Sequence, residues 1–365
     1  MKEGGKMTVF KNALVYGTLT DIAVEDGIIK KIGRIKEEGI DLKGAKLYPG
    51  LIDTHSHGCL GYDASDLEDH LGEMAEYELA HGITTWYPTT MTISVDDLSE
   101  IIKRDLKGYG GANMPGFHME GPFINVKCKG AQNESYVIPA NMDAFNLCNA
   151  SGQVKKITVA PECEGAIEFI KSCPALVSIG HTECDYDTAR AAFSAGAKCI
   201  THTYNTMPGI HHRAPGPIGA GSDSEGVYAE LICDGIHIHE SAVRMLIKIF
   251  GEDRIVLISD SVRACGLPDG IYDLGGLNIT VKDGVARTEG GNLAGSTTNL
   301  FNCVKKAISF GIPEESAVKM ASENPARMMG LNKGRIEVGY DADFIAVDGD
   351  FNLLFTVVGG RVYGK

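Results

Sequence analysis

The sequence has a shortage of basic charge. Its 365 residues include 34 lysines and arginines against 48 aspartates and glutamates, giving a formal net charge of -14 at pH 7. A strongly acidic surface is repelled by nucleic-acid phosphates and by anionic membranes. We therefore expect neither nucleic acid nor a membrane as a partner. A small anionic ligand is compatible with this charge, because a few local donors are enough to hold it.

Long hydrophobic runs are also missing. No apolar run approaches the roughly 20 residues that span a bilayer. The first seven residues are charged and rich in glycine, and they lack the apolar core of a secretory signal. These features predict a cytoplasmic protein.

Paired cysteines are missing as well. The ten cysteines are scattered singly, and no C-x-x-C pair occurs. This spacing argues against a structural zinc site and against a disulfide framework. We expect reduced thiols, as in most cytosolic proteins.

Both ends of the chain have the alternating pattern of short strands. Residues 8–49 alternate apolar and polar positions around glycine turns, and residues 344–363 do the same. Strand-rich ends that flank a different middle indicate one discontinuous β module. We predict a small β-sandwich domain built from residues 1–48 and 335–365, and a second domain over residues 49–334.

The middle of the chain repeats a strand and then a helix. Eight apolar runs each end in polar residues, at 45–52, 83–87, 114–119, 156–159, 175–179, 197–200, 227–233 and 255–258. Helical spacing is found at 66–80, 95–106, 164–170, 185–195 and 240–249, and after a glycine-rich loop at 300–310 and 314–329. This pattern predicts an α/β fold of the (β/α)8 TIM-like barrel type, whose site lies at the carboxyl ends of the strands. A doubly wound sheet is the alternative, but it would not gather residues from every strand end.

Histidines and a carboxylate at these strand ends indicate a metal site. His55 and His57 are two residues apart, which places both side chains on one face of a strand. Glu120, His181 and His202 end three other runs. Two histidines and one carboxylate are typical of catalytic zinc with an open position for water, although iron, manganese or cobalt would also fit.

Asp260 ends the eighth run and is the candidate general acid and base. A carboxylate beside an activated water accepts its proton and later donates to a leaving nitrogen. The alternatives are a helix N-cap or a structural salt bridge. A separate group of side chains is rich in hydrogen-bond donors and suited to bind a phosphate: Asn205, His211, His212, Arg213 and His237.

Several motifs together resemble one family. They are P-G-L-I-D-T-H-S-H-G from Pro49, H-M-E-G-P-F from His118, G-H-T from Gly180, T-H-T-Y-N-T-M-P from Thr201, D-G-I-H from Asp234, S-D from Ser259, L-A-G-S from Leu293 and G-R-I-E-V-G-Y-D-A-D-F from Gly334. The chain resembles the N-acetylglucosamine-6-phosphate deacetylases of the amidohydrolase superfamily over nearly its whole length. The resemblance implies metal-dependent hydrolysis of the acetamide. Alternatives are a related sugar such as N-acetylgalactosamine 6-phosphate and a non-catalytic scaffold with this fold.

The resemblance also implies roles for individual residues. Glu120, His181 and His202 would bind the main metal ion, and Asp260 would be the acid and base. The contacts implied with the sugar phosphate and acyl group come from Ala131, Asn205, Thr206, Arg213, His237, Leu293, Ala294 and Gly295. In the family the residue matching Arg213 reaches into the neighbouring site, so a homodimer is expected.

Three positions, 132, 55 and 57, differ among members of the family. Some carry a histidine where this chain has Gln132, and use it to polarise the amide carbonyl. Here Gln132, or a second metal ion, would do that work. His55 and His57 are replaced in some members that use one metal ion. Their presence here is compatible with two ions bridged by Glu120.

Overall fold

The computed structural model describes residues 7–364. The prediction drawn from the N-terminal stretch falls almost entirely outside these residues. Within the described part of the chain, no helix combines the length and the apolar character needed to cross a bilayer.

Eight parallel strands form the barrel, as the sequence predicts. The sheet order is β15-β14-β13-β12-β11-β10-β9-β6. Their bounds are Leu51–Ser56 for β6, Ile83–Thr90 for β9, Phe117–Glu120 for β10, Val154–Val159 for β11, Leu176–Ile179 for β12, Cys199–Ile200 for β13, Tyr228–Ile232 for β14 and Ile255–Ile258 for β15. Each strand is fully or almost fully buried, which is why these segments read as continuous apolar runs.

The first and last barrel strands meet without a regular ladder. The N–H of Asp260, just past β15, donates to the carbonyl of His55 on β6 at 2.9 Å. The backbone N–H of Ser259 points at the carboxylate of Asp53, 3.3 Å from Oδ2. These contacts nearly close the barrel and fix the two strand ends beside each other.

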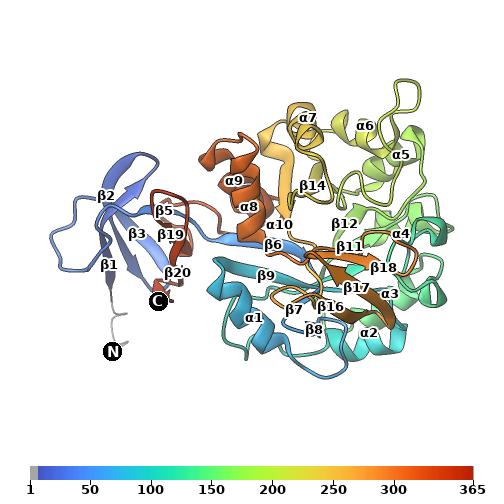
Figure 1. Cartoon of the computed structure of the whole chain (residues 1–365), viewed down its shortest axis with the longest axis horizontal. Helices are drawn as coiled ribbons and strands as arrows, with labels where there is room; N and C mark the ends of the chain where they lie inside the picture. Colours follow the sequence, from blue (N-terminus) through green and yellow to red (C-terminus); the bar gives the residue numbers. More distant parts are fainter. Residues whose placement is uncertain (1–6, 365) are drawn as a thin grey trace.

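Helices surround the barrel at most of the predicted places (Figure 1). Their bounds are Leu71–Ala80 for α1, Val95–Ile102 for α2, Met142–Cys148 for α3, Ala166–Ser172 for α4, Tyr186–Ala195 for α5, Gly216–Ser222 for α6, Glu240–Phe250 for α7, Leu300–Ser309 for α8, Glu314–Ala321 for α9 and Glu323–Met329 for α10.

Three helix predictions were wrong at their boundaries. The helix expected over 95–106 ends at Ile102. The helix expected over 66–80 begins only at Leu71, because the Asp66 carboxylate accepts from the N–H of Asp63 and pairs with Arg263 instead of starting a helix. The helix expected over 314–329 is divided at Ser322 into α9 and α10. Pro325 explains the break, because it has no N–H to donate to the carbonyl four residues earlier.

The two ends of the chain form a separate β module, seen at the left of Figure 1 with both termini. Its sheet has the order β21-β20-β19-β5-β1-β2-β3, with β4 paired to β1. The bounds are Thr8–Val15 for β1, Thr18–Glu25 for β2, Ile28–Gly33 for β3, Ile40–Asp41 for β4, Lys46–Pro49 for β5, Phe344–Val347 for β19, Leu353–Val358 for β20 and Arg361–Tyr363 for β21. The predicted barrel with a β module from both termini is thus confirmed. The exact domain limits stay a prediction.

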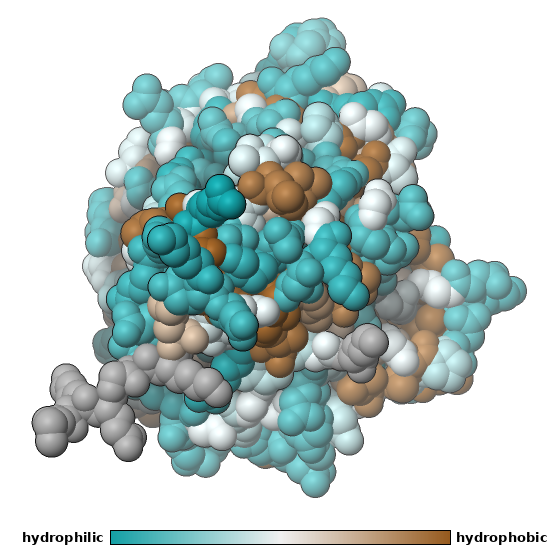
Figure 2. All heavy atoms as spheres, turned by 90° about the vertical axis from the view of Figure 1, so that its left-hand side faces the viewer, coloured by the Kyte–Doolittle hydropathy of each residue, from teal (hydrophilic) through white to brown (hydrophobic). Residues whose placement is uncertain are grey.

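The module has a core of its own. Phe10, Ile22, Ile29, Leu47 and Phe344 are completely buried in one cluster. Figure 2 shows this end of the molecule from outside, where hydrophilic residues prevail and hydrophobic ones form small patches. The apolar positions of the alternating pattern therefore face inward.

A third sheet was missed by the sequence analysis. The segment between β15 and α8 was expected to be a glycine-rich loop, but it forms the antiparallel strands β16 (Gly270–Leu274), β17 (Leu277–Lys282) and β18 (Val285–Thr288). Two-residue glycine turns, Gly275-Gly276 and Asp283-Gly284, connect these strands, and all four residues have positive φ. Its apolar residues Leu274, Ile279 and Val281 pack in one cluster with Met91, which follows β9, and Figure 1 labels the three strands between β11 and α2.

Gly50 joins the module to the barrel, because β5 ends at Pro49 and β6 begins at Leu51. The single run predicted over 45–52 is therefore two strands in different sheets. A Cβ at Gly50 would overlap the side chain of Thr84 on β9. Glycine is required here by the close approach of two strands.

We predict that Gly50→Ala lowers the free energy of unfolding by about 1–3 kcal/mol through overpacking. Calorimetric unfolding measures this. Gly349→Ala is the matched control, because a Cβ there meets nothing within 4 Å. Equal melting temperatures for the two variants would contradict the prediction.

Candidate active site

A cavity of about 660 Å3 opens at the carboxyl ends of the barrel strands. Its deepest part is made by the predicted metal ligands and Asp260, which come from five different strands. Those in the cavity wall are His57, Glu120, His181, His202 and Asp260, and His55 lies completely buried beneath them. The structure therefore brings together all six residues that the sequence placed at strand ends.

Three of these residues have a left-handed backbone. φ is 48° at His181, 27° at His202 and 48° at Asp260. Each lies two residues past its strand end, where the chain turns away from the barrel. This conformation costs a non-glycine residue roughly 1 kcal/mol or more and tends to occur at functional sites. The positive φ turns these side chains into the cavity instead of along the strand.

Glu120 lies at the centre of the cluster. Its Oε1 is 3.2 Å from His181 Nε2 and 3.0 Å from His202 Nε2. The same oxygen is 3.2 Å from His55 Nε2, and Oε2 is 3.2 Å from His57 Nε2. One carboxylate thus faces four imidazole nitrogens.

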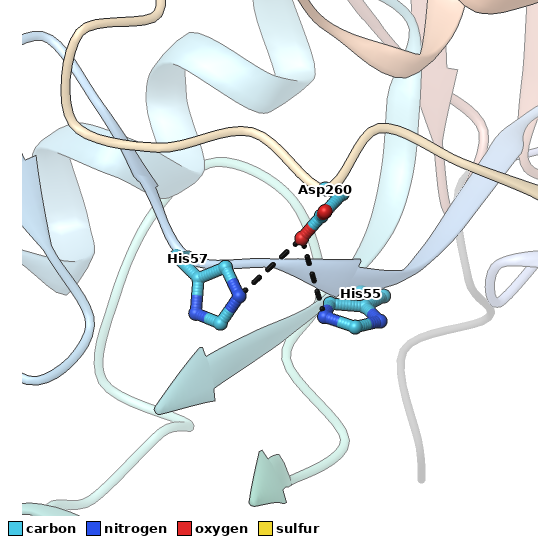
Figure 3. Close-up of side chains that lie close together, drawn as sticks. All are labelled: His55, His57 and Asp260. Atoms are coloured by element: carbon cyan, nitrogen blue, oxygen red, sulfur yellow. Dashed lines mark ion pairs between the residues drawn. The ribbon is translucent and has the colours of Figure 1, made fainter. Parts of the chain in front are cut away.

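The ligand atoms form two groups. Glu120, His181 and His202 make one, and His55, His57 and Asp260 make the other, with the ligand atoms of each group within 4.8 Å of one another. Figure 3 shows the second group: Asp260 points down from its loop at both rings. Its Oδ1 is 3.3 Å from His55 Nε2 and 3.4 Å from His57 Nε2. Buried imidazole and carboxylate donors suit a divalent transition-metal ion, so the residues present fit such an ion.

On three of the four histidines the ring nitrogen opposite the cluster faces an acceptor, whereas Nδ1 of His202 has no hydrogen-bond partner among the described residues. His57 Nδ1 lies 3.1 Å from the carbonyl of Thr89, and His181 Nδ1 lies 2.8 Å from the carbonyl of Cys128. A carbonyl accepts only, so Nδ1 carries a proton and Nε2 is the nitrogen that faces the cluster. This is the usual arrangement around metal-binding histidines.

The site concentrates opposite charges in a buried space. Burial alone would lower the pKa of His55, but Glu120, Asp260 and Glu230 outweigh it and raise that pKa to about 9. Burial would raise the pKa of Glu120, but His55 and His181 hold it well below its usual range. The carboxylates likewise raise the pKa of His57 well above its usual range, so in the metal-free protein protons on His55 and His57 balance the carboxylates.

Gln132 is fixed at both ends of its amide. Its Nε2 donates to Oε2 of Glu120, and its Oε1 accepts from the N–H of Thr92 at 2.7 Å. The side chain lines the cavity next to Ala131. The predicted role in polarising the amide carbonyl stays a prediction, and only the second N–H of the Gln132 amide is free for it.

Most residues predicted to contact the substrate line the same cavity, namely Ala131, Gln132, Asn205, Thr206, His237, Leu293 and Gly295. Ala294 is completely buried and packs against an apolar cluster with Met91 and Val262, so its side chain does not reach the cavity. Arg213 is exposed and lies in a separate groove with Tyr186. The roles of all these residues stay predictions.

Several residues of the site were missed from the sequence. Met91, Val262 and Leu274 form an apolar wall of the cavity. Lys156 and Glu230 lie beneath the metal groups inside the barrel, both with no exposed surface. A signal for this pair was present, because each is a charged residue inside an apolar barrel strand.

Known proteins resemble this chain over nearly its full length. The model of the amidohydrolase family matches residues 47–363. The N-acetylglucosamine-6-phosphate deacetylase of Vibrio furnissii is 37% identical over 355 residues, covering 93% of this chain and 89% of the relative. The N-acetylgalactosamine-6-phosphate deacetylase of Escherichia coli O157:H7 is 35% identical over 340 residues, covering 90% of each.

A solved structure has the same fold throughout. It is a substituted form of the N-acetyl-D-glucosamine-6-phosphate deacetylase from Mycobacterium smegmatis in complex with N-acetyl-D-glucosamine 6-phosphate. It superposes with a TM-score of 0.92 at 30% identity, covering 99% of this chain and all of that one.

We predict that metal binding releases protons and strengthens as the pH rises from 6 to 8. His55, with a pKa raised to about 9, is protonated in this range when no metal is bound, and a metal ion needs its free lone pair. Each displaced proton should strengthen binding about tenfold per pH unit below that pKa. Calorimetric titrations in buffers of different ionisation enthalpy count the protons. His237→Gln, outside both metal groups, should release the same number; a count of zero in the wild type would contradict the prediction.

Proposed function

The chain belongs to the amidohydrolase family, and we propose that it hydrolyses the acetamide of N-acetyl-D-glucosamine 6-phosphate to D-glucosamine 6-phosphate and acetate. The observation that carries this proposal is the convergence of Glu120 and five other side chains, suited to metal binding and acid-base chemistry, at the end of the barrel. The relatives named for this deacetylation support it, since they match the chain over most of its length.

The cofactor is a divalent metal ion. We propose zinc, because nitrogen and oxygen ligands at this spacing suit it, with iron, manganese and cobalt as alternatives. Glu120, His181 and His202 would hold one ion, and His55, His57 and Asp260 offer a second group. One or two ions per subunit fit this ligand set. When bound, such an ion lowers the pKa of water and polarises a carbonyl.

Asp260 carries the proton in the proposed mechanism. Its carboxylate takes a proton from the attacking water as oxygen adds to the acetyl carbon. The same carboxyl then donates to the amide nitrogen as the C–N bond breaks, so water is consumed and an amine and acetate leave. Burial would raise the pKa of Asp260, but His55 and His57 hold it below its usual value, so the carboxylate is ionised and ready to accept.

We propose that the sugar phosphate lies in the cavity between the metal groups and the cavity mouth. Asn205, the backbone at Thr206 and His237 would hold the phosphate, and Ala131 with residues 293–295 would flank the sugar or acyl group. Burial would lower the pKa of His237, but its hydrogen bond to Asp234 at 2.7 Å raises it overall. A cationic His237 would suit a phosphate in this acidic protein. Since a sugar phosphate is a metabolite of the cell interior, we propose a cytoplasmic enzyme.

A second candidate substrate is N-acetylgalactosamine 6-phosphate. The relative from Escherichia coli O157:H7 is named for that sugar, and its identity of 35% is close to that of the relatives named for the glucosamine sugar. The chemistry at the metal groups would be the same for both sugars. Only contacts with the sugar ring would separate them.

We also propose a homodimer in which Arg213 serves the neighbouring site. Arg213 is exposed, its guanidinium touches His212 at 2.7 Å, and it lies outside the cavity wall of its own chain. An exposed arginine beside the mouth of a phosphate site is well suited to reach a partner's ligand.

We predict that reconstituted enzyme deacetylates N-acetylglucosamine 6-phosphate and that the metal-stripped protein does not. Release of free amine measures the reaction. Parallel assays with N-acetylgalactosamine 6-phosphate and with unphosphorylated N-acetylglucosamine rank the substrates by kcat/KM. A higher kcat/KM for the galactosamine sugar would favour the second candidate, and no reaction with either sugar after metal reconstitution would reject both.

Asp260→Asn is the matched variant for this assay. It keeps the shape of the side chain but removes the proton acceptor, so kcat should fall by about three or more powers of ten. Metal analysis should still find the ion of the Glu120 group. Wild-type turnover in this variant would reject the role of Asp260.

We predict that Arg213→Ala raises KM for the phosphorylated sugar about tenfold or more, through loss of a charge-assisted hydrogen bond. Mixed dimers with Asp260→Asn test whether Arg213 acts across the interface. Each mixed dimer joins an Arg213→Ala subunit to an Asp260→Asn subunit. One of its two sites then has Asp260 and receives Arg213 from the partner, so the wild-type KM should return with half the wild-type kcat per dimer. Mixed dimers that keep the raised KM would show that Arg213 acts only within its own subunit.

A further inference from the structure

A buried ion pair crosses the barrel interior beneath the metal groups. Lys156 on β11 donates from Nζ to Oε1 of Glu230 on β14, and neither side chain has any exposed surface. Taking two charges out of water costs several kcal/mol, and well-packed apolar residues often replace such a pair without loss of stability. The pair therefore needs an explanation beyond holding the barrel together.

The contacts of Glu230 supply that explanation, because they lead to the metal site. Its Oε2 lies 3.1 Å from Nδ1 of His55 and accepts from the backbone N–H of His202 at 3.2 Å. Its Oε1, besides binding Lys156, is 3.4 Å from the hydroxyl of Thr54. One carboxylate thus contacts a ligand of one metal group and the backbone of a ligand of the other.

His55 differs from His57 and His181 in the kind of acceptor that its Nδ1 faces. Nδ1 of His57 and of His181 faces a backbone carbonyl, whereas Nδ1 of His55 faces a carboxylate. A carboxylate acceptor fixes the tautomer and also raises the basicity of the opposite nitrogen. That nitrogen, His55 Nε2, has no hydrogen-bond partner among the described residues and points at Glu120 and Asp260.

We propose that Glu230, balanced by Lys156, is a positioning residue that holds His55 with its proton on Nδ1 and its Nε2 lone pair directed into the metal site. This inference rests on the metal-dependent function proposed above and extends it to residues below the ligands.

Lys156 has a definite part in this arrangement. Its Nζ binds Oε1 of Glu230, so the other oxygen, Oε2, is left facing Nδ1 of His55. Nζ of Lys156 also lies 3.4 Å from the carbonyl of Thr54, next to His55 in the chain. The lysine therefore fixes the orientation of the Glu230 carboxylate beneath His55.

The test compares metal binding by the full-length wild type and by the double variant Glu230→Gln/Lys156→Met. The double variant removes both charges together, so it leaves no unpaired buried ion and should fold. Zn2+ is titrated into the metal-free proteins against a chromophoric chelator, without sugar. We expect at least tenfold weaker binding of one ion, within the 10- to 100-fold range typical for partners behind metal ligands.

Glu78→Gln is the matched control. Glu78 on α1 is also a buried glutamate, and burial with nearby Asp53 raises its pKa well above its usual value, so its carboxyl is already neutral. The affinity of the Glu78→Gln variant for Zn2+ should equal that of the wild type. A folded double variant with wild-type affinity and stoichiometry would overturn the proposal.

A second measurement needs no variant and decides the matter even if the double variant does not fold. In Zn2+-loaded wild-type protein labelled with 15N-histidine, the His55 ring should show a proton on Nδ1 and metal-shifted Nε2. An unprotonated Nδ1 would overturn the proposal. Because both measurements use the metal alone, absence of deacetylase activity would reject the proposed function without touching this inference.

Discussion

The carboxylate of Glu120 is the point on which the site depends. It meets four imidazole nitrogens at 3.0–3.2 Å in a place with almost no access to water. The four rings come from three strand ends: His55 and His57 from β6, His181 from β12 and His202 from β13. The contacts can therefore form only where the barrel brings these strand ends together. The backbone hydrogen bond from the N–H of Asp260 to the carbonyl of His55 joins the ends of β15 and β6 beside this cluster.

The polar layer beneath the cluster follows from the same constraint. Several buried histidines and carboxylates cannot share an apolar surrounding without further hydrogen bonds and opposite charges. Glu230 and Lys156 supply some of these hydrogen bonds and opposite charges. His118 adds a neutral ring that packs edge-on against His55, with the ring centroids 4.5 Å apart. Burial, reinforced by Lys156, holds the pKa of His118 well below its usual range, so that ring brings no further positive charge. The interior is therefore arranged by charge as much as by shape.

The barrel and most of the site could be predicted from the sequence because both follow from local patterns. Buried parallel strands appear as apolar runs, and chemistry at their carboxyl ends appears as histidines and acids that interrupt the pattern. The sheet of β16–β18 could not be predicted this way, since its strands are half exposed, short and joined by glycine turns that resemble a loop. The left-handed backbone at His181, His202 and Asp260 has no local signal either, because contacts from other strands impose it. Lys156 and Glu230 were visible as charges in apolar runs, but only the fold shows that they meet.

The sheet of β16–β18 is attached to the barrel beside Asp260. Ser296, just after it, donates its N–H to the carbonyl of Asp260 at 2.8 Å and accepts from the N–H of Val262 at 2.9 Å. The two turns of the β16–β18 sheet are distant from Ser296 in the chain. Leu274, which directly precedes the first turn, lines the cavity. Changes in the length or sequence of those turns can therefore reshape the cavity wall at Leu274, while the two backbone hydrogen bonds of Ser296 keep Asp260 in place.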